Sequence, residues 1–275
     1  MNLKDLDKLS QSFSTTEKMP VLFLGHGNPM NAIEENQFVK GFRAVAKTLL
    51  RPNAILCVSA HWYTNGTKVT AMEMPRTIHD FGGFPKELFE VEYPASGSPC
   101  LAQDTKILLQ PTLVELDEKW GLDHGAWSVI KHLFPNADIP VVQLSIDYTK
   151  PAEYHFELAQ KLNSLRNRGI LIIGSGNIVH NLALVDWKNF EKDNHGHDWA
   201  IEARETLNNL LLNGDFKTLI NYHQISKAIN LAVPTPDHYL PLIYVLALRQ
   251  KGESLELFND KLVAGSLSMT SVKIS

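Results

Sequence analysis

Five short, largely apolar runs constrain the fold of this chain more than any other feature of its sequence. They lie at residues 20–25, 53–60, 68–73, 139–146 and 169–176. Continuous rather than alternating hydrophobicity is typical of strands that are covered on both faces, as in a parallel sheet. Two segments between the runs, 36–50 and 152–166, have the apolar spacing of helices. Strands that alternate with helices predict an α/β fold.

The C-terminal part of the sequence departs from this alternation. A helical pattern at 238–251 is followed by two strand-like segments, 254–260 and 266–275, joined by glycine-containing turns. We therefore predict a single α/β domain with a mixed, largely parallel central sheet flanked by helices. Residues 20–275 would form this domain, and residues 1–19 would form an N-terminal arm, either as a short helix or as a loose segment.

The composition argues against several classes of function. The chain has 275 residues, of which 44% are hydrophobic and 20% charged, with a net charge of -4. Such a balance provides no basic surface for nucleic acid or for an anionic membrane. No apolar run approaches the roughly 18 residues of a membrane span, and the polar start does not resemble a secretory signal. Two cysteines cannot make a disulfide framework, which fits a reducing cytoplasm. We expect a cytoplasmic protein that is a monomer or a small homo-oligomer.

Four of the eleven histidines stand at the ends of predicted strands or behind a rigid turn. His26 follows the first run and His61 ends the second, while His180 follows the fifth run and its turn, and His238 follows two prolines. The carboxyl ends of parallel strands meet at one edge of a sheet, so these imidazoles can converge. Three or four imidazoles without thiolates suit Zn(II) or Fe(II). The sequence therefore predicts a metal site.

The residues around these histidines carry further expectations. Gly25 and Gly27 flank His26, and we expect them to leave room for a ligand to approach the ring. His124 precedes an amphipathic helix, for which Asp123 is a candidate N-cap. The irregular segment 74–100 is rich in aromatic residues and is long enough to be functional.

Within that segment, His79 is a candidate for lining a pocket, although loop histidines are commonly just solvated. Its aromatic residues would bind an aromatic substrate or would form local core. The spacing of His195 and His197 resembles a metal clip, but both lie in a polar stretch without a buried flank. No role is assigned to the remaining histidines, which are His132, His155, His195, His197 and His223.

Six motifs connect this chain with a known family. They are, in order, "LGHGNPM", "VSAHW", "TIHDFGGFP", "LDHGAW", "GSGNIVHN" and "PTPDHYLPL". Together they resemble the class III extradiol ring-cleavage dioxygenases, and within them the DOPA 4,5-dioxygenase subfamily. The resemblance spans residues 20–274 and implies one α/β domain, a mononuclear metal, and insertion of both atoms of O2 into a catechol ring.

The resemblance also implies roles for individual residues. Metal ligation falls on His26, His61 and His238, with His180 as a fourth ligand or as the acid–base residue. His124 matches the second active-site histidine, which would act in catalysis or orient the substrate, and we place His79 beside it as a substrate-binding candidate.

Other members of the superfamily close the metal site with two histidines and a glutamate, whereas the third position here reads Asp237-His238. An all-imidazole site resembles catalytic zinc sites. We therefore expect one divalent metal per chain, either Fe(II) for ring cleavage or Zn(II) as bound in the isolated protein. The expected partners are a small catechol and O2.

Two alternatives remain open at this point. The first is a zinc-dependent hydrolase that uses a metal-bound water, whose pKa three histidines can lower to roughly 7. The second is a non-catalytic binding protein on the same fold, which the missing carboxylate favours. The presence of both His124 and His180 argues against this second alternative, because a binding protein needs no proton-transfer groups.

Overall fold

The computed structural model describes residues 13–275, so residues 1–12 of the predicted N-terminal arm lie outside the described part. The rest of the arm is attached to the domain. The backbone N–H of Thr16 donates to Asn167 O over 2.8 Å, and that of Met19 to Arg166 O over 2.9 Å. The side chain of Met19 is buried, so the packed core begins before the predicted boundary at residue 20.

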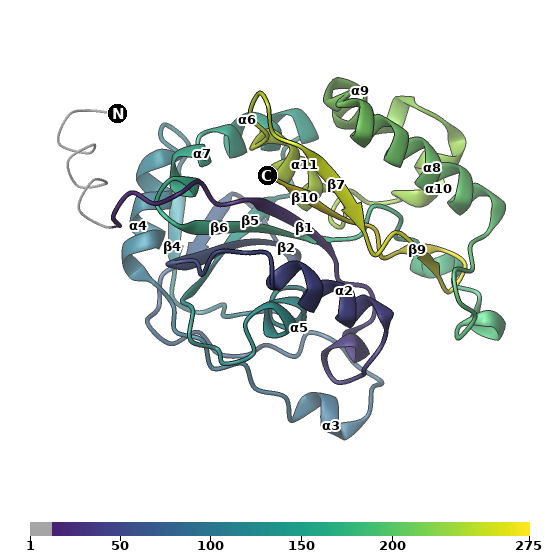
Figure 1. The fold of residues 1–275 in the computed structure, drawn as a ribbon, viewed down its shortest axis with the longest axis horizontal. Coiled ribbons are helices and arrows are strands. Elements are labelled where there is room, and N and C mark those ends of the chain that lie inside the picture. The colour runs from purple at the N-terminus through teal and green to yellow at the C-terminus, as the bar shows by residue number, and fades with distance from the viewer. Residues whose placement is uncertain (1–12) are drawn as a thin grey trace.

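Within residues 13–275, eight strands form one sheet in the order β4-β3-β5-β2-β6-β1-β10-β7 (Figure 1). Their bounds are β1 Val21–Gly25, β2 Ala54–Thr64, β3 Thr67–Thr70, β4 Val114–Asp117, β5 Val141–Asp147, β6 Ile170–Gly176, β7 Leu255–Phe258 and β10 Ser271–Ile274. The four central strands β5, β2, β6 and β1 are parallel. Strands β10 and β7 add antiparallel pairs at one edge, and β3 pairs antiparallel with β5 at the other. The predicted mixed, largely parallel sheet is confirmed.

Helices cover both faces of this sheet. They are α2 Gln37–Ala46, α3 Lys86–Phe89, α4 Pro99–Leu108, α5 His124–Leu133, α6 Ala152–Gln160, α7 Asn163–Arg166, α8 Asp198–Asn213, α9 Phe216–Ile220, α10 Lys227–Ala232 and α11 Leu240–Ala247. Helices α2 and α5 pack on one face, and α4, α6 and α11 on the other, with α8 and α10 beyond them. None of the helices in the described part is long and apolar enough to cross a membrane.

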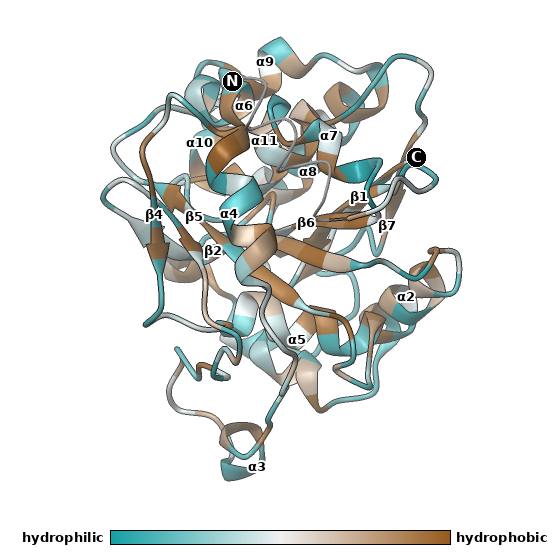
Figure 2. Cartoon of the chain, turned by 90° about the vertical axis from the view of Figure 1, so that its left-hand side faces the viewer, coloured by the Kyte–Doolittle hydropathy of each residue, from teal (hydrophilic) through white to brown (hydrophobic). Residues whose placement is uncertain are grey.

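The strands are buried on both sides, as their continuous hydrophobicity predicts. In β1, Val21 and Phe23 belong to the core on the α6–α11 face, whereas Leu22 and Leu24 belong to the core on the α2–α5 face. Burial of each such side chain contributes about 1.5–3 kcal/mol. Figure 2 shows brown, hydrophobic strands at the centre of the sheet and teal segments around it. This rigid sheet positions the loops that follow β1, β2 and β6.

The structure differs from the sequence-based expectations in several elements. Strand β4 was not predicted, because its segment "VELD" is short and half charged. The helix expected over 152–166 is divided into α6 and α7. The prediction that His61 ends its strand is wrong: β2 continues to Thr64, with a shift in its register against β5 between Val58 and Tyr63. This irregularity re-aims the side chains of the bulged stretch, which includes His61.

Candidate metal centre

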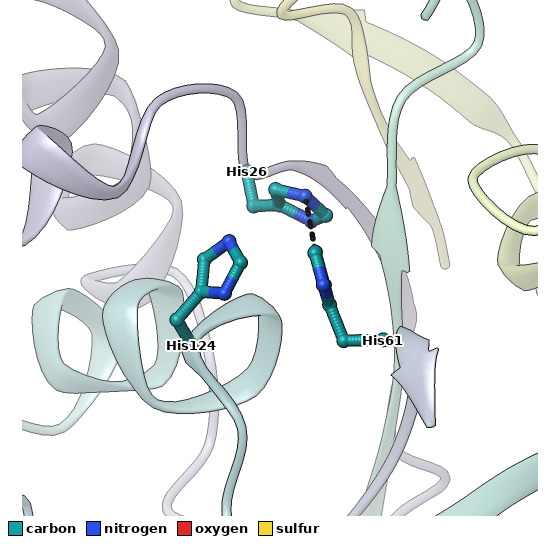
Figure 3. A group of neighbouring side chains, drawn as sticks. All are labelled: His26, His61 and His124. Atoms are coloured by element: carbon teal, nitrogen blue, oxygen red, sulfur yellow. Dashed lines mark hydrogen bonds between the residues drawn. The ribbon is translucent and has the colours of Figure 1, made fainter. Parts of the chain in front are cut away.

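Five imidazoles meet beyond the carboxyl ends of the central strands. His26 follows β1, His61 lies in the irregular stretch of β2, and His124 is the first residue of α5. Figure 3 shows these three rings pointing toward one another. The ring of His238 lies 5.2 Å from that of His26 between centroids, and His180 stacks on His238 with centroids 3.5 Å apart. The structure thus brings together all four predicted metal ligands and His124.

The tightest group consists of His26, His61 and His124, whose potential ligand atoms all lie within 4.8 Å of one another. Nε2 of His26 and Nε2 of His61 are 3.2 Å apart (dashed line in Figure 3). Two nitrogens bound to one cation at roughly 2.0–2.1 Å with a tetrahedral angle lie about 3.3 Å apart. The separation and the chemistry of these donors therefore fit a single divalent metal.

Asp80 holds two of the imidazoles from behind. Its Oδ2 lies 3.1 Å from Nδ1 of His61, and its Oδ1 lies 3.0 Å from Nδ1 of His124. The backbone N–H of His124 also donates to Oδ1 over 2.8 Å. A carboxylate on Nδ1 leaves Nε2 available and makes it more basic, as is usual for histidines that bind metals. Sequence reasoning missed Asp80, although it directly follows His79 in the motif "TIHDFGGFP".

The outer nitrogens of two more rings have partners. Nδ1 of His26 lies 3.0 Å from Oγ of Ser175, and Nδ1 of His238 is hydrogen-bonded to the carboxylate of Asp237. Among the described residues, no side chain or backbone group forms a hydrogen bond with the ring of His180. Its ring is positioned by stacking on His238 instead.

Burial decides the protonation of most of these rings. Burial, together with the neighbouring imidazoles, lowers the pKa of His26, and burial and His238 lower the pKa of His180 to about 3. Burial also lowers the pKa of His124 and His238, although Asp80 and Asp237 oppose it. These four rings are therefore neutral at pH 7, the form that binds metals and accepts protons.

The neighbouring carboxylates shift the pKa of the histidines in the opposite direction to burial. Burial lowers the pKa of His61, but the hydrogen bond to Asp80 and the charge of Asp123 outweigh it, so the pKa is raised. Burial alone would raise the pKa of Asp80, but its hydrogen bonds with His124 and His61 lower it well below the usual range. An ionised carboxylate thus stands directly behind the imidazoles and can balance the charge of a cation.

A buried network fixes the start of α5, and with it His124. Asp123 caps the helix by accepting from the N–H of Ala126, which confirms its predicted role. Ser59 Oγ donates to the same carboxylate over 2.6 Å, and Gln143 Nε2 donates to its second oxygen over 2.7 Å. Because Ser59 lies in β2 and Gln143 in β5, the helix is registered against the sheet.

The two glycines around His26 also allow a close packing contact. A Cβ on Gly25 would lie 2.6 Å from the carbonyl oxygen of Met269, and one on Gly27 would lie 2.3 Å from the Met269 sulfur. Gly27 also has a φ of +61°, which disfavours a side chain. Met269 therefore packs where side chains at these two positions would lie. Gly27 also lines the cavity described below, and the expectation that the glycines leave room for a ligand stays a prediction.

A cavity of about 530 Å³ adjoins the imidazoles and is lined by all five of them and by Asp80. Most of the rest is apolar, including six residues called here the apolar wall: Phe81, Phe84, Leu182, Val185, Trp187 and Phe190. Two aromatic residues of segment 74–100 therefore reach the cavity. Tyr93 of the same segment is buried in the core and donates to Phe134 O over 2.8 Å.

His79 does not line this cavity. Its Nε2 lies 2.9 Å from the carbonyl oxygen of Val91, and its ring contacts that of Phe81, with centroids 5.8 Å apart. His195 and His197 do not line it either: they contact the carboxylate of Asp186 and the carbonyl of Leu184. These contacts anchor the segment that carries the second half of the apolar wall.

Comparisons with known proteins agree with this geometry. Residues 19–266 match the family described as "Catalytic LigB subunit of aromatic ring-opening dioxygenase". The chain is 49% identical over 264 residues to "4,5-DOPA dioxygenase extradiol" of Escherichia coli K12, covering 94% of this chain and 96% of the relative. It is 34% identical over 260 residues to the protein of the same name from Beta vulgaris, covering 92% and 95%.

A solved structure gives the same result. The crystal structure of an uncharacterized protein from Escherichia coli K12 is 45% identical and superimposes with a TM-score of 0.81, covering 94% of this chain and 100% of that one. The family predicted from the six motifs, the extradiol ring-cleavage dioxygenases, is thereby confirmed. The chain belongs to the LigB family of aromatic ring-opening dioxygenases.

Proposed function

We propose that this dioxygenase opens the ring of a DOPA-type catechol by extradiol cleavage, with one Fe(II) held by His26, His61 and His238. The observation that carries the proposal is the convergence of five imidazoles beside a largely apolar cavity. A volume of about 530 Å³ lies within the range of small-molecule sites. The names of the relatives from E. coli and Beta vulgaris support a DOPA-type substrate.

The metal would be Fe(II) in the active enzyme. Bound iron supplies a redox-active centre for the catechol oxygens and O2, which Zn(II), without a second accessible oxidation state, does not. The same imidazoles also suit Zn(II), so the isolated protein would bind zinc in an inactive form. The ordered Nδ1 partners of His26, His61 and His238 support their assignment as ligands, because such partners orient the coordinating nitrogens.

His180 would be the acid–base residue and, in addition, a fourth ligand or a neighbour of the metal. Its ring is neutral at pH 7 and forms no hydrogen bond with the described residues. A nitrogen of its ring would accept the proton of a catechol hydroxyl and return a proton once the ring has opened. Because the ring is fixed by stacking on His238, this transfer would occur at a constant position beside the metal.

His124 would orient the substrate and assist catalysis. Its Nδ1 faces Asp80, so its Nε2 would accept a hydrogen bond from a substrate hydroxyl. The substrate-binding role predicted for His79 would be indirect: its contact with Phe81 supports a ring that lines the cavity.

An alternative set of three ligands is His26, His61 and His124. The short distances among these three rings favour His124 as a candidate ligand in place of His238.

The function is tested by loading the protein with Fe(II) without oxygen and then adding L-DOPA and air. We expect a yellow, ring-opened product and one O2 consumed per catechol, with no turnover by the zinc-loaded control. Failure to open any of several catechols would overturn the proposal.

The ligand set is tested separately, by metal content. His238→Ala should lose bound metal, whereas His124→Ala should retain it and lose turnover. The reverse pattern would make His124 the third ligand and leave His238 as a neighbour of the site.

A further inference from the structure

The motif "GSGNIVHN" supplies a second residue to the site besides His180. Its serine, Ser175, lies in β6, the strand between β2 and β1, and is fully buried. Ser175 is opposite Leu24 in the register of β1 and β6, and the backbone N–H of His26 donates to the carbonyl of Gly176 over 3.2 Å. The sheet therefore holds Ser175 beside the segment that carries the His26 ring.

The hydroxyl of Ser175 has two partners. Its oxygen lies 3.0 Å from Nδ1 of His26, and it donates to the carbonyl oxygen of Gly125 in the first turn of α5. A serine hydroxyl has one proton and two lone pairs, and a carbonyl oxygen can only accept. Because the hydroxyl proton points at Gly125, the oxygen of Ser175 can bond to His26 only as an acceptor.

The direction of this bond decides which nitrogen of His26 carries the proton. A neutral imidazole has a single N–H, and Nδ1 needs it to donate to Ser175. Nε2 of His26 therefore keeps its lone pair, which faces Nε2 of His61 over 3.2 Å. Asp80 occupies Nδ1 of His61 in the same way. The inner nitrogens of both rings are thereby left for a metal.

The same hydroxyl connects His26 with helix α5. Gly125 directly follows His124 and is buried. A Cβ on Gly125 would lie 2.6 Å from Oγ of Ser59 and 2.7 Å from Cδ2 of His61, so the helix start packs on β2 without room for a side chain. The hydroxyl of β6 thus ties the ring of one predicted ligand to the helix that carries another histidine of the site.

We propose that Ser175 is a positioning residue of this dioxygenase, whose hydroxyl fixes the proton of His26 on Nδ1 and holds the ring against the start of α5. This inference rests on the proposed function, because it takes His26 as a metal ligand. The outer partners of His61 and His238 are carboxylates, whereas the hydroxyl of Ser175 orients a ring without adding charge. Loss of an outer partner typically lowers metal affinity by about 10–100-fold.

The position of the proton can be measured in the wild-type chain. Long-range proton–nitrogen correlation spectra of isotope-labelled protein distinguish a protonated ring nitrogen from an unprotonated one. At pH 7 we expect Nδ1 of His26 to carry the proton in the zinc-loaded and in the metal-free protein, with its signals identified by their loss in His26→Gln. A proton on Nε2 in the metal-free protein, or zinc bound through Nδ1, would overturn the inference.

Ser175→Ala removes the hydroxyl and tests its contribution. The affinity for Zn(II), measured by competition with a chelator, should fall by about 10–100-fold. In the metal-free variant, the ring of His26 should populate both neutral tautomers instead of one. An affinity and a tautomer equal to those of the wild type would contradict the proposed role.

The matched control is Ser145→Ala. Ser145 is also fully buried in a central strand, and its oxygen accepts from Oγ1 of Thr64 and from the N–H of Lys68, each over 2.8 Å. Neither partner is an imidazole. Both variants should unfold at lower urea concentrations than the wild type, but only Ser175→Ala should change the zinc affinity and the tautomer. An equal loss of zinc affinity in the control would show that Ser175 contributes to the fold alone.

These measurements need no catechol, so they separate this inference from the proposed function. If the iron-loaded enzyme opens no catechol, the proposed function fails, while the zinc affinity and the proton position still decide the role of Ser175. If the enzyme opens catechols and Ser175→Ala keeps the wild-type affinity and tautomer, the function holds and this inference fails.

Discussion

The two ends of the central strands bury polar side chains for opposite purposes. At the amino ends, Arg166 is fully buried and its guanidinium is surrounded by acceptors. Its Nε donates to Met19 O over 2.8 Å, its Nη1 to Leu248 O over 2.6 Å, and it forms an ion pair with Glu253. Glu253 in turn pairs with Lys18 at 2.8 Å. These residues do not line the cavity beside the imidazoles.

At the carboxyl ends, charged or hydroxyl partners stand on the outer side of the imidazoles, and their inner side adjoins a cavity. Ser175, Asp80 and Asp237 occupy the outer nitrogens of the imidazoles, and the inner nitrogens of His26 and His61 face each other beside the cavity. A completely partnered group stabilises a fold, whereas a group that is oriented but not saturated can bind and react. The comparison teaches that the number of partners, rather than burial, distinguishes the structural end from the functional one.

The largest effect is expected at the carboxyl ends of the strands, from removing a predicted metal ligand. His26→Ala should abolish metal binding and lower ring-cleavage activity by at least about 10³-fold, because the chemistry depends on the metal. Metal per chain and the rate of product formation are measured on the same sample. A variant that kept its iron and its rate would show that His26 is not a metal ligand and would contradict the functional role assigned to the carboxyl ends.

His180→Ala should separate chemistry from metal binding. We expect it to retain measurable iron while turnover falls by roughly 10²–10⁴-fold, the usual contribution of an acid–base group. Iron content and kcat, determined beside those of His26→Ala, check this. If His180→Ala empties the site as completely as His26→Ala does, His180 is an obligate ligand and the acid–base role passes to His124.

Arg166→Met should destabilise the network at the amino ends of the strands without affecting the chemistry. It leaves Glu253 buried with part of its pairing lost, and we expect a loss of about 3–5 kcal/mol in the free energy of unfolding. Urea denaturation measures this loss, and kcat per folded molecule should stay as in the wild type. The control is Arg51→Met, which removes an exposed pair with Asp138 and should cost less than about 1 kcal/mol.

The network of Arg166 and Glu253 should also make the stability of the fold sensitive to acid. Burial by itself would raise the pKa of Glu253, but the hydrogen bonds from Arg166 and Lys18 lower it from 4.5 to about 2. A carboxyl whose folded pKa is depressed stabilises the fold above its unfolded pKa, and this contribution is lost as the pH falls from 4.5 toward 2. We expect a loss of about 2 kcal/mol, measured by urea denaturation across this range. In Glu253→Gln that part of the acid dependence should be absent.

The smallest effect concerns the residues that contact the outer nitrogens of the imidazoles. Asp80→Asn keeps the size of the side chain but removes the charge that orients His61 and His124, and should reduce metal affinity or turnover by about 10–100-fold. Competition with a chelator and steady-state rates measure the two quantities. The control Asp138→Asn lies in the exposed pair with Arg51 and should change neither. An unaffected Asp80→Asn would mean that helix α5 and the sheet suffice to orient these rings.

Much of this architecture could be predicted from the sequence because it depends on local patterns. Continuous apolar runs predict the four central parallel strands, and a histidine just after such a run falls at the shared edge of the sheet. This reasoning placed His26, His61 and His180 near one another, although His61 lies within β2 rather than at its end. It was correct about Asp123 as well, since a helix N-cap is set by its immediate neighbours in the sequence.

The remaining features depend on contacts between distant segments. Nothing in the sequence near Asp80 indicates that its carboxylate reaches both His61 and His124, and the glycines around His26 are explained by Met269, which lies near the C-terminus. Strand β4 has too few apolar residues to predict on its own and is recruited by pairing with β3. Such features follow from the assembled fold, which a pattern along the chain does not contain.

Asp80 has one more consequence, because it adjoins Phe81 of the apolar wall while its carboxylate engages His61 and His124. The same short loop thus belongs both to the surface that would contact substrate and to the support of the imidazoles. By thermodynamic linkage, a catechol that orders this loop and so tightens the hold on the metal must itself bind more tightly, by the same factor, when the metal is present. Substrate and metal would then retain each other, and the resting enzyme would release its metal more readily than the occupied one.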